Sequence, residues 1–400
     1  MRKLSEDFES KFENDFKFVI DFVKENKDDV FLGVRDNSIN LYGNGGSFFQ
    51  ISKSKDKYFA YVNSGDEVNK KGYFSKISKE VYKVLNDING KEITGDNKEA
   101  WNSILYDLKC AVKSYMEKHK TGKGEGSSKE KILQQKLALA FNNQDNPYFT
   151  YDIEYNIESL NDYYFLKDGK ADKRRHSHTL GRMDNMVICI KDNKIYFHLM
   201  ELKEGMNAIE GTNFNSKSKD KLYDSFGNGV IGHINLYMTI IDYIKKNKKY
   251  VSAYRMEHRY KPFVFDIRKL LLDEVKYIMS FYKKFGLINN KCFNDIDYEK
   301  LDFGNVDLIF YLGGYVANSK KFEKHLGVYG KNNDSVINLI NNNPTEYKYI
   351  GKNQIYDFKF YKDFKLYNED RVSADLKVDN YSEVKVIHDK DEIKFDIIIK

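Results

Sequence analysis

The chain has 400 residues, of which 41% are hydrophobic and 32% are charged, so it is long enough for two or three domains and polar enough for a globular protein. Its formal net charge is +6, and its three cysteines lie far apart, which excludes a disulfide framework and a zinc site built on closely spaced cysteines. We expect a cytoplasmic protein with no membrane contact, because the sequence shows no signal peptide and no apolar run long enough to span a bilayer.

The first part of the chain, residues 1–119, is expected to form an α+β domain for recognition or partner binding. Apolar residues recur at helical spacing over 6–25, and residues 97–119 have the pattern of a second amphipathic helix. Between them, residues 30–63 alternate between apolar and polar side chains, which predicts a small meander with turns at 36–37 and 43–46.

A Gly/Lys/Ser-rich linker at 120–128 precedes a compact series of predicted elements. The sequence predicts, in order, a helix over 128–143, a strand over 148–157, two strands over 182–203, a helix over 232–249 and a strand near 250–256. The fold class is therefore α/β, with an α-β-β-β-α-β core over 129–261. Residues 262–400 are expected to form a C-terminal α+β extension whose tail is rich in strands.

Two carboxylates in the strand over 148–157 break its apolar pattern. Asp152 and Glu154 share the polar face of this strand. For Asp152 we favour a solvent-facing position over a supporting role beside a metal, and for Glu154 both interpretations stay open.

The two strands over 182–203 are joined by a turn that sets their pairing. Asp192 and Asn193 suit a two-residue turn, because both residue types tolerate positive φ. Counting outward from this turn puts Asp184 opposite Glu201, with Cβ atoms roughly 4.5 to 5.5 Å apart. A four-residue loop with the same centre gives the same pairing, and a three- or five-residue loop shifts it by one.

The charges at the end of this hairpin need a counter-ion. Both faces of the two strands are largely apolar, as in central strands of a sheet that helices cover. Two carboxylates that meet there repel each other, and burial increases the repulsion. A divalent metal relieves it, and Mg²⁺ prefers carboxylate oxygens while keeping waters. Lys203, on the same face, can then assist an attacking water.

This pattern resembles the PD-(D/E)XK nuclease superfamily over residues 127–260. The resemblance lies in Asp184, a spacer and Glu201-x-Lys203 at the end of the next strand, together with the α-β-β-β-α-β order. It implies a restriction-endonuclease-like core with a central mixed sheet flanked by helices. It also implies that Asp184, Glu201 and the backbone carbonyl of Leu202 bind the metal, and that Lys203 is the catalytic lysine. Met183 stands where the superfamily's name has proline.

The context of Glu201 distinguishes it from other copies of the same tripeptide. Glu-x-Lys also occurs at Glu25, Glu346, Glu383 and Glu392, so the tripeptide alone carries no information. Only at Glu201 does an Asp lie at hairpin register between apolar strands. An ordinary surface hairpin with a salt bridge is the alternative interpretation.

Further residues are assigned to the site by position. Glu130, on the first core helix, matches a further acidic ligand of the superfamily, but Ser127-x-x-Glu130 is also a capping box, and both roles stay open. Gln134 lies one turn later and is a candidate phosphate contact. The loop before Asp184 adds candidate nucleic-acid contacts, namely Arg174, Arg175, His176 and Arg182.

The predicted function is that of a Mg²⁺-dependent endonuclease, with Mn²⁺ as a substitute, acting on DNA rather than RNA. Local basic runs such as those at 167–178 and 245–249 suit a nucleic-acid partner. Analogy with the superfamily suggests restriction or phage defence, and a homodimer is the default because both strands of a duplex must be cut. The alternative is a non-catalytic nucleic-acid-binding or assembly protein on the same fold.

Overall fold

The structure is a computed structural model that describes residues 2–62, 75–118, 128–155, 166–167, 170–171, 183–202, 249–256, 259–311, 346–351, 354–359, 381–389 and 392–399. Contacts between Cα atoms divide the chain into two compact units. Unit 1 comprises 1–153 and 274–299, and unit 2 comprises 154–273 and 300–400. These boundaries differ in position from the linker predicted at 120–128, since the helix after that linker belongs to unit 1.

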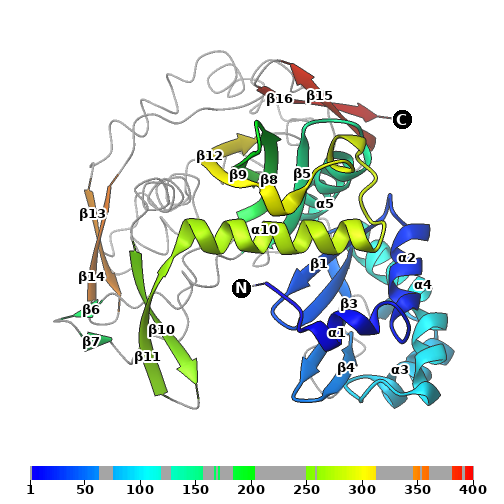
Figure 1. Cartoon of the computed structure of the whole chain (residues 1–400). Coiled ribbons are helices and arrows are strands. Elements are labelled where there is room, and N and C mark those ends of the chain that lie inside the picture. The colour runs from blue at the N-terminus through cyan, green and yellow to red at the C-terminus, as the bar shows by residue number, and fades with distance from the viewer. Residues whose placement is uncertain are drawn as a thin grey trace, which may run out of the picture. The chain divides into compact units, whose positions relative to one another are not determined.

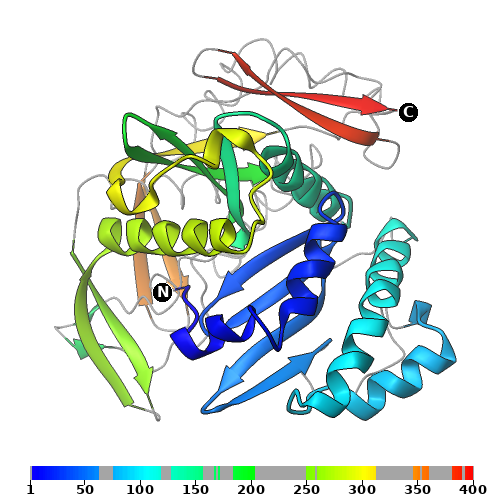
Figure 2. The same ribbon diagram turned by 45° about the vertical axis from the view of Figure 1, so that its right-hand side comes forward.

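An antiparallel meander forms the sheet of unit 1 (Figure 1). Its strands follow one another in the order β1-β2-β3-β4, as predicted, and their bounds are Val30–Arg35, Ser38–Gly43, Gly46–Ser54 and Lys57–Tyr61. The tight turns require left-handed backbone, which Asn37 (φ 45°) and the Asn44-Gly45 pair (φ 49° and 81°) supply. Figure 2 shows the blue arrows of this meander side by side.

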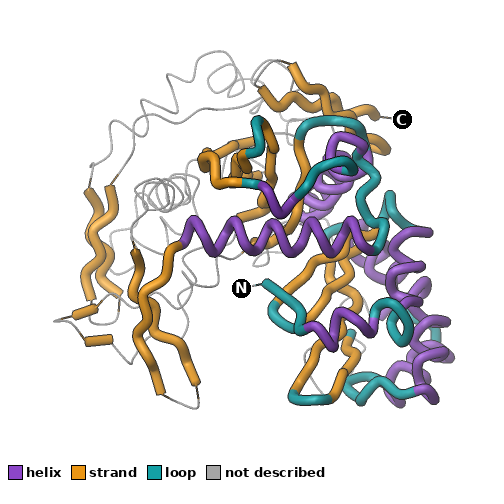
Figure 3. The backbone as a smooth tube through the Cα atoms, in the orientation of Figure 1, coloured by secondary structure: helices purple, strands orange, loops and turns teal. Residues whose placement is uncertain are grey.

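The helix predicted over 6–25 is wrong as a single element, because the structure breaks it into α1 (Glu6–Lys11) and α2 (Lys17–Glu25). Figure 3 shows the loop between them in teal. The break directs two buried rings to different partners. Phe12 packs edge-on against Phe281, with ring centroids 5.9 Å apart, whereas Phe16 packs against Tyr58 of β4 at 5.5 Å.

Of the remaining helices of unit 1, those predicted over 97–119 and 128–143 are confirmed, and a helix over 79–88 was not predicted. Their bounds are Lys79–Ile88 for α3, Gly95–Lys118 for α4 and Ser128–Asn143 for α5. Trp101 of α4 is completely buried, and its ring lies 5.3 Å from that of Phe49 on β3, so the apolar face of α4 covers the meander. The C-terminal half of α10 (Ile267–Lys284) also belongs to unit 1 and ends before Gly286, whose φ is +63°.

A mixed sheet in unit 2 contains the predicted hairpin. β8 (Met183–Lys191) and β9 (Lys194–Leu202) are antiparallel, and β12 (Asp302–Tyr311) pairs with β9 in parallel. β5 (Tyr148–Tyr155) ends in this unit and completes the order β12-β9-β8-β5. A mixed α/β fold is therefore confirmed.

The strand predicted near 250–256 does not lie beside the hairpin. It forms β10 (Lys249–Met256) and pairs with β11 (Arg259–Asp266) instead. The strand beside β9 is β12, about 100 positions further along the chain than β9. The sequence pattern of 250–256 identified a strand correctly, but the sheet that the strand joins could not be predicted, because β-pairing partners are not encoded in a strand's own apolar pattern.

The predicted strand-rich tail is confirmed in the described part of the C-terminal region. The hairpin β13–β14 has the bounds Glu346–Gly351 and Gln354–Lys359, and β15–β16 has Tyr381–Asp389 and Glu392–Ile399. A smaller hairpin, β6–β7, has Leu166–Lys167 and Lys170–Ala171, and short 3₁₀ turns lie at Lys291–Phe293 and Tyr298–Lys300. Within the described ranges, no helix is both long and apolar enough to cross a membrane.

The turn of the β8–β9 hairpin gives a direct test of the register. Asn193 has φ 57°, so Asn193→Val should lower the stability of the hairpin by about 1–2 kcal/mol, and Asn193→Gly should preserve or raise it. Hydrogen exchange of the β8 and β9 amides measures this. Lys194→Thr, beside the turn in ordinary strand conformation, is the control and should change protection by less than about 0.5 kcal/mol. Equal effects of the two Asn193 variants would contradict this account of the turn.

Candidate active site

The end of the β8–β9 hairpin is the predicted site, and the structure confirms the register that leads to it. Asp192 and Asn193 both have positive φ (52° and 57°), as a two-residue turn of this type requires. Lys191 pairs with Lys194, and the ladder continues without a shift to Asn185 opposite Met200. The ladder ends at that pair, one step short of Asp184 and Glu201, so their pairing stays a prediction.

The surroundings of Asp184 are buried, whereas Asp184 itself is partly exposed. Met183, Asn185 and Met186 are each at most 1% exposed. On the other side of β9, Phe310 of β12 lies beside Glu201 in the parallel ladder. Buried residues thus flank a partly exposed Asp184 near the start of β8.

The structure describes only some of the other predicted site residues, and two of them by their backbone alone. The side chains of Glu130 and Glu201 lie outside the described residues, although their backbones belong to α5 and β9, and the backbone of Leu202 is the last of β9. Outside the described residues altogether are Lys203, Arg174, Arg175, His176 and Arg182. Gln134 is buried, with 1% of its surface exposed, so it does not offer its amide on the surface of unit 1.

The residues at the hairpin end fit a hard divalent cation. Asp184 and Glu201 lie on adjacent strands, and carboxylate oxygens are ligands that a hard divalent cation takes. Within the described residues, no group of three or more His, Cys, Asp or Glu side chains is placed to hold a metal. Asp184 and Glu201 supply only two carboxylates, so an ion bound there would also need backbone oxygen or water as ligands.

A second concentration of charge lies in the interior of unit 1. Asp152 of β5 is completely buried, so its predicted solvent-facing position is wrong. One carboxylate oxygen, Oδ2, lies 2.7 Å from Nη1 of Arg2, and the other, Oδ1, accepts a hydrogen bond from Nη1 of Arg35. Glu274 of α10 accepts a hydrogen bond from the backbone N–H of Arg2 at 3.0 Å. Two arginines and two carboxylates thus compensate each other inside the unit.

Arg35 also fixes the backbone of β5. Its Nη2 donates to the carbonyl oxygen of Ile153 at 3.1 Å and to the Tyr42 hydroxyl at 3.0 Å. Burial lowers the pKa of the Arg35 guanidinium, but Asp152 and Tyr42 outweigh this and raise the pKa above its ordinary value. Glu154, the next residue of β5, has φ 51°, so the strand leaves regular geometry directly after this anchor.

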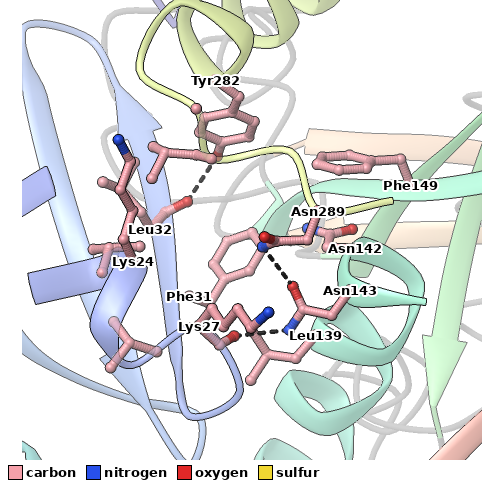
Figure 4. Close-up of a pocket in the computed structure, with 14 residues that line it drawn as sticks. Lys24, Lys27, Phe31, Leu32, Leu139, Asn142, Asn143, Phe149, Tyr282 and Asn289 are labelled. Atoms are coloured by element: carbon pink, nitrogen blue, oxygen red, sulfur yellow. Dashed lines mark hydrogen bonds between the residues drawn. The ribbon is translucent and has the colours of Figure 1, made fainter. Parts of the chain in front are cut away.

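A small pocket of about 70 Å³ lies in unit 1 near the same residues (Figure 4). Phe31, Phe149 and Tyr282 contribute its aromatic wall, and the Tyr282 hydroxyl donates to the carbonyl oxygen of Leu32 at 2.7 Å. Burial and the nearby Asp152 raise the pKa of Tyr282, so its hydroxyl stays protonated. Asn289 donates to Asn143 at 3.0 Å. The pocket is held together by its own hydrogen bonds and has room for only a few atoms.

The buried charges were not predicted as a group. Asp152 occupies a polar position of an alternating strand. That pattern fits a side chain exposed to solvent and also a buried side chain with a charged partner. Arg2, Arg35 and Glu274 come from three segments that are distant from Asp152 in sequence, and nothing in their local patterns links them.

No protein-family model, curated protein or solved structure matches this chain. The functional argument accordingly rests on the residues and on their placement in the structure.

The buried carboxylate gives a stability prediction. Asp152→Asn leaves Arg35 without a carboxylate and Arg2 with only Glu274, at 3.7 Å, so the free energy of unfolding should fall by about 3–5 kcal/mol. Urea denaturation measures the change. The matched control is Asp15→Asn, which removes the partner of Lys11 in an exposed pair and should cost less than about 1 kcal/mol. Similar losses in both variants would contradict the role of Asp152.

Proposed function

We propose that the chain is a Mg²⁺-dependent endonuclease that hydrolyses phosphodiester bonds, with DNA favoured over RNA as its substrate. The observation that carries the proposal is the uninterrupted ladder from the Asp192-Asn193 turn toward Asp184 and Glu201. It supports two facing carboxylates at the end of strands whose neighbouring residues, such as Asn185 and Met200, are buried. By analogy with nucleases of this fold, the proposal includes a role in restriction or phage defence. It also includes action as a homodimer.

The sheet of unit 2 supports the proposed core. An antiparallel pair with a third strand parallel to β9 makes the sheet mixed, as the restriction-endonuclease-like core requires. β5 and the helix α5 precede the hairpin in the chain, which agrees with the α-β-β-β start of that core. In this proposal β12, rather than a strand near 250–256, is the last strand of the core.

Each proposed residue has one task in the hydrolysis. Asp184, Glu201 and the carbonyl of Leu202 hold the metal, with Glu130 as a further ligand if its carboxylate does not cap α5. The metal supplies positive charge that acidifies water and polarises the phosphate. Lys203 orients the water whose oxygen bonds to phosphorus as the bond to the leaving oxygen breaks, and its ammonium offsets the negative charge that develops on the phosphate. Arg174, Arg175, His176 and Arg182 contact the substrate's phosphates.

Cleavage of duplex DNA tests the proposal. The wild-type protein should cut with Mg²⁺ or Mn²⁺ and not with EDTA, whereas Lys203→Ala and Glu201→Ala should each lower the rate by about 10² or more. Far-UV circular dichroism verifies that both variants fold.

The matched control uses another copy of the same tripeptide. Lys394→Ala alters Glu392-x-Lys394, which lies in the hairpin β15–β16, and should leave the rate unchanged. If the wild type cuts neither duplex, single-stranded DNA nor RNA with either metal, the enzyme proposal fails. Binding without cleavage would favour the non-catalytic alternative.

A further inference from the structure

The pocket of Figure 4 combines an apolar wall with positive charge. All the residues that line it belong to unit 1, and half of them are aliphatic residues or phenylalanines, including Phe31, Leu139 and Phe149. Among these described residues, only Lys24 and Lys27 are charged. The lining therefore favours a ligand that has both an apolar part and a negative charge.

The carboxamide side chains of the lining are bound to other parts of unit 1. Asn142 donates to the carbonyl oxygen of Thr150 at 2.8 Å and accepts from the N–H of the same residue at 2.7 Å. Asn143 donates to the carbonyl oxygen of Lys27 at 2.8 Å and accepts from Asn289 at 3.0 Å. These bonds hold the walls in place, so the pocket is preformed and a ligand meets mainly apolar surface inside it.

The rim of the pocket consists of its three exposed residues, Lys24, Lys27 and Gly286. Neither lysine forms a salt bridge with another described residue. The nearby carboxylate of Asp28 accepts a hydrogen bond from Asn143 at 3.3 Å and is not part of the lining. Nζ of Lys24 lies 3.4 Å from the position that a Cβ would take at Gly286, so a side chain there would crowd the ammonium group. Glycine leaves this group open to a ligand.

This rim suits a carboxylate better than a phosphate. Phosphate sites are commonly built from backbone N–H groups and arginine. The N–H groups of Gly286 and Leu287 already donate to the carbonyl oxygens of Lys283 and Tyr282, and no arginine is among the described lining residues. Two ammonium groups can instead each donate to one oxygen of a carboxylate.

The volume of the pocket limits the apolar part of the ligand. A dry cavity of roughly 150 Å³ admits benzene, so the pocket of about 70 Å³ has room for an apolar body of about three carbons. We propose that the pocket is a binding site for a short-chain monocarboxylate, whose hydrocarbon chain lies against the apolar wall and whose carboxylate lies between Lys24 and Lys27. This inference concerns unit 1 alone and does not depend on the nuclease proposal.

Butyrate is the probe that tests this site, because it joins a carboxylate to a chain of three further carbons. Broadening of its methyl resonance in an NMR titration of the full-length protein gives the Kd. Acetate has the charge without the chain and should bind at least about tenfold more weakly, since it buries two fewer methylene groups. Butylammonium has a chain with the opposite charge and should also bind at least about tenfold more weakly.

Two variants test the rim and the wall separately. Lys24→Gln/Lys27→Gln should weaken butyrate binding at least about tenfold and leave the binding of uncharged butan-1-ol unchanged. Leu287→Phe enlarges a half-buried lining residue and should abolish the binding of both ligands, because the ring occupies the pocket. Far-UV circular dichroism verifies that each variant folds.

The matched control removes two exposed lysines that do not line the pocket. Lys76→Gln/Lys79→Gln, just before and at the start of α3, should bind butyrate as the wild type does. The inference is overturned if the wild type does not bind butyrate at millimolar concentrations, or if it binds butylammonium equally well. It is also overturned if the two double variants bind butyrate alike, or if folded Leu287→Phe binds it as the wild type does.

Discussion

Two consecutive residues in the left-handed region, Asp192 and Asn193, fix how β8 lies against β9. Because side chains alternate between faces, a slip of one residue would move every side chain of one strand to the opposite face. It would exchange the face that carries Met186 and Ile188 for the one that carries Asn185 and Val187, and so disturb the packing of all four buried side chains. β12 pairs with the other edge of β9, so it lies beside a strand whose pairing with β8 is set by this turn.

Features encoded over short stretches of sequence could be predicted. The meander of unit 1 and the β8–β9 hairpin depend on period-two alternation and on residues that accept positive φ, such as Asn37 and Asn193. The helices α4 and α5 depend on a helical period that continues for several turns. At the candidate site the same local rules predicted the pairing that the structure shows as far as Asn185 opposite Met200, and the structure adds that the sequence neighbours of Asp184 are buried.

Features that depend on distant partners could not be predicted. Asp152 is buried together with Arg2 and Arg35, which reach it from other segments. Phe12, in the break between α1 and α2, packs against Phe281 of α10. The parallel neighbour of β9 was missed for the same reason. Periodicity reports that a segment has an apolar face, but it does not report which surface covers that face.

The order of synthesis has a consequence for the strand β12. Leu202 ends β9, and Tyr311, its neighbour in β12, is made more than 100 residues later. At about 5–20 residues per second, the edge of β9 waits roughly 5–20 s on the ribosome before its partner exists. An unpaired apolar strand edge is a site of misfolding and aggregation during that interval. Slower translation between β9 and β12 would therefore lengthen the time in which a nascent chain needs a chaperone.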